Sequence, residues 1–149
     1  MPARTVRTPA FLTRLAPFAG TVLRVAVGIV FIAHGYQKVS NGLEGFAGFL
    51  TSLNVPMPDL MSYVVTILEI GGGILLILGL GTRIVALLLA LEMVFTIALV
   101  KLDAGFIGQQ GTGAELDFLL LAGGLTLALL GPGALSADRA LGMEPGPVV

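Results

Sequence analysis

The chain has 149 residues, the length of one domain, and 56% of them are hydrophobic while only 11% are charged. Soluble domains carry about 25% charged residues, so this composition indicates an integral membrane protein. The net charge of −1 and the absence of cysteine exclude a basic nucleic-acid-binding surface, disulfides, and iron–sulfur clusters held by this chain alone. With one histidine, His34, no haem can be held between two histidines and no metal site is expected.

Four apolar stretches are predicted to cross the membrane, because a spanning helix needs about 20 apolar residues. They follow a polar N-terminal tail at 1–16, and a turn at 79–83 forces the second and third to be antiparallel neighbours. The sequence therefore predicts an all-α membrane protein, an antiparallel four-transmembrane-helix bundle. Its membrane domain covers 17–142 and a C-terminal tail covers 143–149. The predicted spans are residues 17–38, 60–80, 82–102 and 115–130.

The segment between the first two spans is too polar to cross, but its apolar residues recur at helical spacing. They predict a short amphipathic helix on the membrane surface between spans 1 and 2, ended by Asn54, Pro56 and Pro58. Farther along, residues 103–113 read as a glycine-rich loop, and Ser136 is predicted to cap a short final helix. The apolar residues of the surface helix are Leu43, Phe46, Ala47, Leu50 and Leu53.

The basic residues predict the orientation, since cytoplasmic segments of membrane proteins are rich in Lys and Arg. Lys38 and Lys101 fall on one side, and five arginines fall on the other, which predicts that both termini are cytoplasmic. The surface helix and the loop at 103–113 then face outward. The five arginines are Arg4, Arg7, Arg14, Arg83 and Arg139.

Three ionisable residues, Arg24, Glu69 and Glu92, lie inside the apolar stretches. Inserting such a residue at the centre of a membrane helix costs about 2.5–3.5 kcal/mol. At 1.5 Å per residue they lie roughly 10, 16 and 15 Å from the inner ends of their spans. Arg binds carboxylates in a forked geometry, so Arg24 is predicted to pair with Glu69 or Glu92. Thr66 and Thr96 share the helix faces of the two acids. Such an intramembrane polar cluster is either a structural network, with the acids paired or neutral, or a proton, quinone or small-molecule site.

A second polar cluster is predicted at the outer surface. His34 and Lys38 lie four residues apart on one helical face, and Glu115 and Asp117 open the fourth span at the same level. Acids at a helix start are explained by the helix dipole alone. The alternative is that they pair with His34 and Lys38 near a headgroup-level site, where His34 passes protons.

A set of short motifs follows one another along the chain: Arg24, His34-Gly35, Lys38, Gly45-Phe46-Ala47, Pro56, Pro58, Leu68-Glu69, Gly72-Gly73, Leu78-Gly79-Leu80, Glu115-Leu116-Asp117, Gly131-Pro132-Gly133 and Ser136-Ala137-Asp138. No single motif is diagnostic, but their order and spacing are specific. Together they resemble the DoxX family of small bacterial membrane proteins over roughly residues 18–142. The resemblance implies a four-helix membrane bundle in the bacterial plasma membrane. It also implies a redox context, because the namesake is associated with a terminal quinol oxidase and thiosulfate–quinone oxidoreduction.

The resemblance transfers no catalytic residues, and three functions are open. The first is an accessory subunit of a membrane-bound redox or respiratory complex, with other membrane subunits and the lipid bilayer as partners. The second is a quinone-interacting oxidoreductase component with a site inside the bundle. The third is a small transporter or proton-conducting bundle. No covalently bound cofactor is expected, a quinone is the expected ligand of the second function, and nucleic acid is not a partner.

Overall fold

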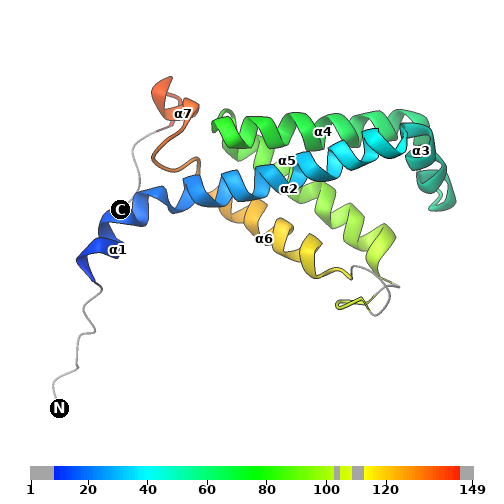
Figure 1. Ribbon diagram of the computed structural model, residues 1–149, viewed down its shortest axis with the longest axis horizontal. Coiled ribbons are helices and arrows are strands. Elements are labelled where there is room, and N and C mark those ends of the chain that lie inside the picture. Colours follow the sequence, from blue (N-terminus) through cyan, green and yellow to red (C-terminus); the bar gives the residue numbers. More distant parts are fainter. Residues whose placement is uncertain (1–8, 103–104, 109–112, 145–149) are drawn as a thin grey trace, which may run out of the picture.

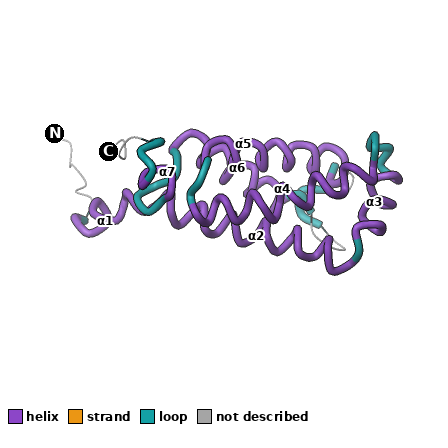
Figure 2. The backbone as a smooth tube through the Cα atoms, turned by 90° about the horizontal axis from the view of Figure 1, so that it is seen from above, coloured by secondary structure: helices purple, strands orange, loops and turns teal. Residues whose placement is uncertain are grey.

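The computed structural model describes residues 9–102, 105–108 and 113–144, and the regular structure in this part of the chain is entirely helical. Four long helices pack in a ring, α2 against α4, α4 against α5, α5 against α6, and α6 against α2 (Figure 1). The molecule is elongated, with α1 and α7 at one end and α3 at the other (Figure 2), so we refer to the α7 end and the α3 end. The elements are α1 (Ala10–Leu15), the 3₁₀ turn η1 (Ala16–Phe18), α2 (Ala19–Asn41), α3 (Leu43–Ser52), α4 (Pro58–Leu78), α5 (Thr82–Thr96), the π-helical segment η2 (Ile97–Lys101), α6 (Glu115–Leu130) and α7 (Ala137–Ala140).

Three helical stretches, Ala10–Asn41, Pro58–Leu78 and Thr82–Lys101, are long and apolar enough to cross a membrane. The first begins within the segment predicted as an N-terminal tail. The fourth predicted span, α6, has 16 residues and is therefore about 24 Å long, less than the roughly 30 Å hydrocarbon core. The all-helical class is confirmed, whereas the fourth crossing stays a prediction.

The helix predicted between the first two spans is present as α3, which packs on α4. Gly42 has a φ of +91°, a left-handed conformation that glycine adopts without strain, and it turns the chain between α2 and α3. Ala47 and Leu50 are buried against the bundle, while Phe49 is exposed. The predicted loop at 103–113 lies partly outside the described residues.

The turn between α4 and α5 is as tight as predicted, and hydrogen bonds to Asp138, which lies near the C-terminus, stabilise it. Gly79 and Gly81 supply positive φ angles of 69° and 61°. The buried Asp138 side chain accepts hydrogen bonds from the backbone N–H groups of Gly81 (2.6 Å) and Thr82 (2.9 Å). Asp138 thereby caps the start of α5. Ser136 caps α7 as predicted, since its Oγ accepts from the backbone N–H of Arg139 (3.3 Å).

The crossing of α2 and α4 depends on two glycines that face each other. A Cβ atom on Gly28 would lie 2.7 Å from the carbonyl oxygen of Gly73, and a Cβ atom on Gly73 would lie 2.7 Å from that of Gly28. Both obstacles are backbone atoms and cannot rotate away. The helices can approach this closely only because neither position carries a side chain.

We expect Gly73→Ala to lower the free energy of unfolding by about 1–3 kcal/mol, the usual effect of overpacking an interface. Gly71→Ala, two positions away on the same helix, is the matched control, because a Cβ there meets nothing within 4 Å. The control should be neutral or stabilising by up to about 1 kcal/mol, since alanine favours helix over glycine. Thermal unfolding in detergent micelles measures both. Equal losses in the two variants would contradict the close-contact explanation.

Candidate functional site

A buried ion pair joins α2 to α4 in the α3 half of the bundle. Lys38 Nζ donates to both carboxylate oxygens of Glu69, at 2.7 Å to Oε1 and 2.6 Å to Oε2. The Glu69 side chain is 3% exposed and that of Lys38 is 21% exposed. Cα–Cβ bonds in a helix tilt toward its N-terminus, so the lysine reaches from the last turn of α2 back into the bundle. The cation thus sits at the boundary of the protein while its partner is fully enclosed.

Gly35 makes room for this pair. It lies one turn before Lys38 and is buried against α4. A Cβ atom on Gly35 would lie 3.1 Å from Glu69 Cβ and 2.6 Å from Ile70 Cγ1. The missing side chain therefore lets the Glu69 segment pack directly on α2, within reach of Lys38.

A second carboxyl group, that of Glu92 on α5, completes the cluster. Glu92 interacts electrostatically with Glu69 and Lys38, and it lies within hydrogen-bonding reach of the Glu69 carboxyl group. Its Oε2 atom is buried and has no hydrogen-bond partner among the described residues. Lys38, Glu69 and Glu92, which we call the KEE cluster, thus bring one cation and two acids together from three helices.

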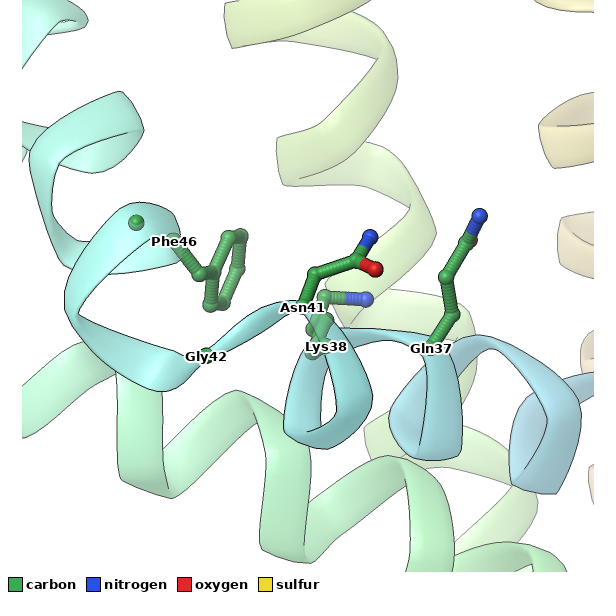
Figure 3. Close-up of a pocket in the computed structure, with 6 residues that line it drawn as sticks. Gln37, Lys38, Asn41, Gly42 and Phe46 are labelled. Atoms are coloured by element: carbon green, nitrogen blue, oxygen red, sulfur yellow. The ribbon is translucent and has the colours of Figure 1, made fainter.

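A pocket of about 280 Å³ opens beside the KEE cluster, where α2 turns into α3. Gln37, Lys38 and Asn41 project from the last turns of α2, and Phe46 faces them from α3 (Figure 3). Lys38 Nζ lies 5.1 Å from the centre of the Phe46 ring, a cation–π distance. The pocket therefore combines hydrogen-bond donors, one aromatic face and a lysine whose charge is already compensated. Among the described residues no group of three His, Asp or Glu side chains could hold a metal ion.

Arg24 does not belong to this cluster, so its predicted pairing with Glu69 or Glu92 is wrong. Its guanidinium group donates to the backbone carbonyl oxygens of Pro132 (2.9 Å), Leu76 (2.7 Å) and Ile77. Leu76 and Ile77 lie in the last turn of α4, where carbonyl groups carry partial negative charge. The Leu76 carbonyl also accepts a hydrogen bond from the backbone N–H of Gly79 (3.0 Å). Arg24 is 2% exposed, and its hydrogen bonds connect α2 to the end of α4 and to Pro132 at the α7 end of the bundle.

Comparison with known proteins shows the family to which the chain belongs. The DoxX family model matches residues 19–102, more than half of the sequence. The chain belongs to the DoxX family. The match runs from the start of α2 through η2 and includes all three residues of the KEE cluster. The resemblance inferred from the sequence is thereby confirmed.

Relatives cover most of this DoxX-family chain. A Bacillus subtilis protein named "Putative oxidoreductase CatD" is 43% identical over 117 residues, 78% of this chain and 82% of the relative. The uncharacterized membrane protein Rv3486 of Mycobacterium tuberculosis is 33% identical over 142 residues, 89% of this chain and 87% of the relative. The inner membrane protein YphA of Escherichia coli is 32% identical over 122 residues, 79% and 86% respectively. No solved structure matches significantly.

The two threonines predicted to belong to the intramembrane cluster bond to their own helices. Thr66 Oγ1 donates to the carbonyl oxygen of Ser62 (2.7 Å), and Thr96 Oγ1 donates to that of Glu92 (3.1 Å). Each hydroxyl is thus satisfied one turn back, the usual arrangement for threonine inside a helix. Neither hydroxyl therefore binds the carboxyl groups of Glu69 and Glu92.

The residues of the predicted outer-surface cluster do not form one group. Lys38 pairs with Glu69, so the alternative in which it binds Glu115 or Asp117 is wrong. Glu115 and Asp117 occupy the first turn of α6, where the helix dipole favours acids, and Asp117 is buried. Glu115 Oε2 is buried without a hydrogen-bond partner in the described part of the chain. His34 is half-buried and makes no hydrogen bond to a described residue.

Sequence reasoning missed Asp138, which caps α5, and the pocket residues Gln37 and Asn41. Asp138 could have been suspected from its place just after a capping serine, but its contact with the α4–α5 turn joins distant segments. Gln37 and Asn41 are polar residues at the exposed end of a long apolar helix. That signal indicates a surface position and does not by itself predict a pocket.

Proposed function

We propose that this DoxX-family chain is an accessory membrane subunit of a redox system and that its pocket beside the KEE cluster receives a quinone head group. The observation that carries the proposal is the pairing of Lys38. Its charge is compensated by Glu69, but an ammonium group has three protons, and the lysine also lines the pocket. An anionic ligand gains little from a compensated cation, whereas a neutral carbonyl oxygen still finds a donor.

The other pocket residues suit the same ligand. The amide groups of Gln37 and Asn41 can donate to carbonyl oxygens, and the Phe46 ring offers a flat apolar face. Quinone head groups are flat, neutral and carry two carbonyl oxygens. The chain has no cysteine, so the electrons would be delivered by partner proteins. The name of the Bacillus relative supports a redox setting.

The proposal includes a membrane arrangement. We place α6 as the fourth crossing, because it packs on α5 and α2, which belong to predicted membrane spans. With both termini cytoplasmic, the α7 end lies inside and α3 lies on the outer surface. Two Escherichia coli relatives are named inner membrane proteins, which supports the bacterial plasma membrane as the location. The pocket then opens at the outer leaflet, where the head group of a lipid-soluble quinone resides.

The test is photolabelling in nanodiscs with an azido-quinone. We expect the label on peptides covering residues 37–46, and competition by unlabelled menaquinone. Asn41→Leu should reduce labelling roughly fivefold, the effect of losing one hydrogen bond of about 1 kcal/mol. Val39→Leu, an exposed neighbour that does not line the pocket, is the control. Labelling outside the pocket, or labelling that ignores Asn41→Leu, would refute the quinone site.

A further inference from the structure

The charges of the KEE cluster do not balance. Lys38 contributes one positive charge, while Glu69 and Glu92 together contribute two negative charges when both are ionised. Glu69 is 2% exposed and Glu92 is half-buried, so water does not compensate the excess. Enclosing an unpaired ion costs several kcal/mol even after the surroundings relax. The cluster therefore needs one more positive charge.

Among the charged groups of the described residues, only Glu69 and Lys38 interact electrostatically with Glu92. Arg24 is occupied at the α7 end, where it binds carbonyl groups. The acids of α6 do not act on Glu92 and could not supply a cation. A proton from solution can supply the missing charge, and it is the cation that needs no coordination shell.

We propose that the KEE cluster is a one-proton site in which Glu92 carries an exchangeable proton. Both Glu69 oxygens already accept hydrogen bonds from Lys38, so a proton placed on Glu69 would have to displace one of them. Glu92 has a buried oxygen without a partner, and a protonated Glu92 could donate toward Glu69. When the proton leaves for water, both carboxylates attract Lys38. The proton thus controls how strongly the two acids attract Lys38, whether or not a quinone occupies the pocket that Lys38 lines.

Infrared spectroscopy of the full chain in nanodiscs tests this inference, because a protonated carboxyl group has its own C=O stretch. We expect one such band at neutral pH, shifted in D₂O, and lost in Glu92→Gln. Glu44→Gln on the exposed face of α3 is the matched control and should keep the band. Lys38→Met removes the positive charge of the KEE cluster, so both of its acids should be protonated and the band should grow about twofold.

Each other outcome overturns the proposal. A band that survives Glu92→Gln but disappears in Glu69→Gln places the proton on the wrong residue. A wild-type chain without the band, whose melting temperature rises with sodium chloride but not with choline chloride, holds a metal cation instead. If Glu92→Gln fails to fold, the test uses the wild-type chain alone. The proposal then requires that the wild-type band shifts in D₂O and disappears on alkaline titration. Quinone labelling is measured separately, so failure of that proposal leaves this one intact.

Discussion

Replacing Lys38 with methionine is expected to lower the free energy of unfolding by about 3–5 kcal/mol, the usual effect of removing one partner of a buried ion pair. Methionine has nearly the same length but no charge, so packing changes little. Glu69, with its side chain 3% exposed, then has no cation, and the acid must stay charged in an apolar interior or take up a proton. Both alternatives destabilise the folded chain. Urea or thermal unfolding in micelles measures the loss.

Two further variants show whether the loss comes from the stranded acid. Gln37→Met, one residue away on the same turn, introduces the same side chain without touching the pair and should change stability by less than about 0.5 kcal/mol. Combining Lys38→Met with Glu69→Gln should restore most of the stability, because replacing both members of a buried pair is often neutral. If Lys38→Met and Gln37→Met are equally stable, the ion pair does not stabilise the fold.

Much of the fold could be predicted because membrane helices are encoded by local properties of the sequence. The predicted spans at 60–80 and 82–102 differ from the helical stretches Pro58–Leu78 and Thr82–Lys101 by no more than two residues at either end. Gly79 and Gly81 fixed the turn between them, since few other residues adopt positive φ. The start of the first helical stretch was harder to predict, because α1 is short and exposed and contains the polar residues Thr13 and Arg14.

The pairing of charges could not be predicted from depth and helix face alone. Those two quantities place Cα atoms, whereas the charged ends of Arg24 and Lys38 lie several bonds away. Both side chains tilt toward the N-terminus of α2. That tilt carries the Arg24 guanidinium toward the α7 end, away from the glutamates. The same tilt carries Lys38 inward from the helix end, so that it reaches Glu69.

As a consequence, the charged side chains at the two ends of the bundle have different partners. At the α7 end, Arg24 and Asp138 bind backbone groups at the end of α4 and the start of α5. Arg24 also interacts electrostatically with Asp138, so the two charges at this end compensate each other. At the α3 end, Lys38, Glu69 and Glu92 bind one another and border a pocket. Titratable groups next to a solvent-accessible space are the arrangement that functional sites use.

Arg24→Leu is therefore expected to be strongly destabilising for a reason unrelated to Glu69 and Glu92. It leaves the carbonyl groups of Ile77 and Pro132 without a donor, at about 1–3 kcal/mol for each buried acceptor left unpaired. It also removes the positive charge that interacts with the buried Asp138. Arg14→Leu removes the same side chain from the exposed α1 and is the matched control. Thermal unfolding and expression level should separate the two variants clearly, and equal behaviour would contradict the role of Arg24 at the end of α4.

Arg24→Lys separates this role from the pairing with acids that the sequence had suggested. Lysine keeps the charge but cannot reproduce the fork that reaches both α4 and Pro132, so the variant should be less stable yet still folded. Its protonated-carboxyl band should match that of the wild type, because the KEE cluster lies at the other end of the bundle. A larger band in Arg24→Lys would show that Arg24 does compensate Glu69 or Glu92. An unchanged band with reduced stability fits an arginine that binds backbone carbonyl groups and does not compensate Glu69 or Glu92.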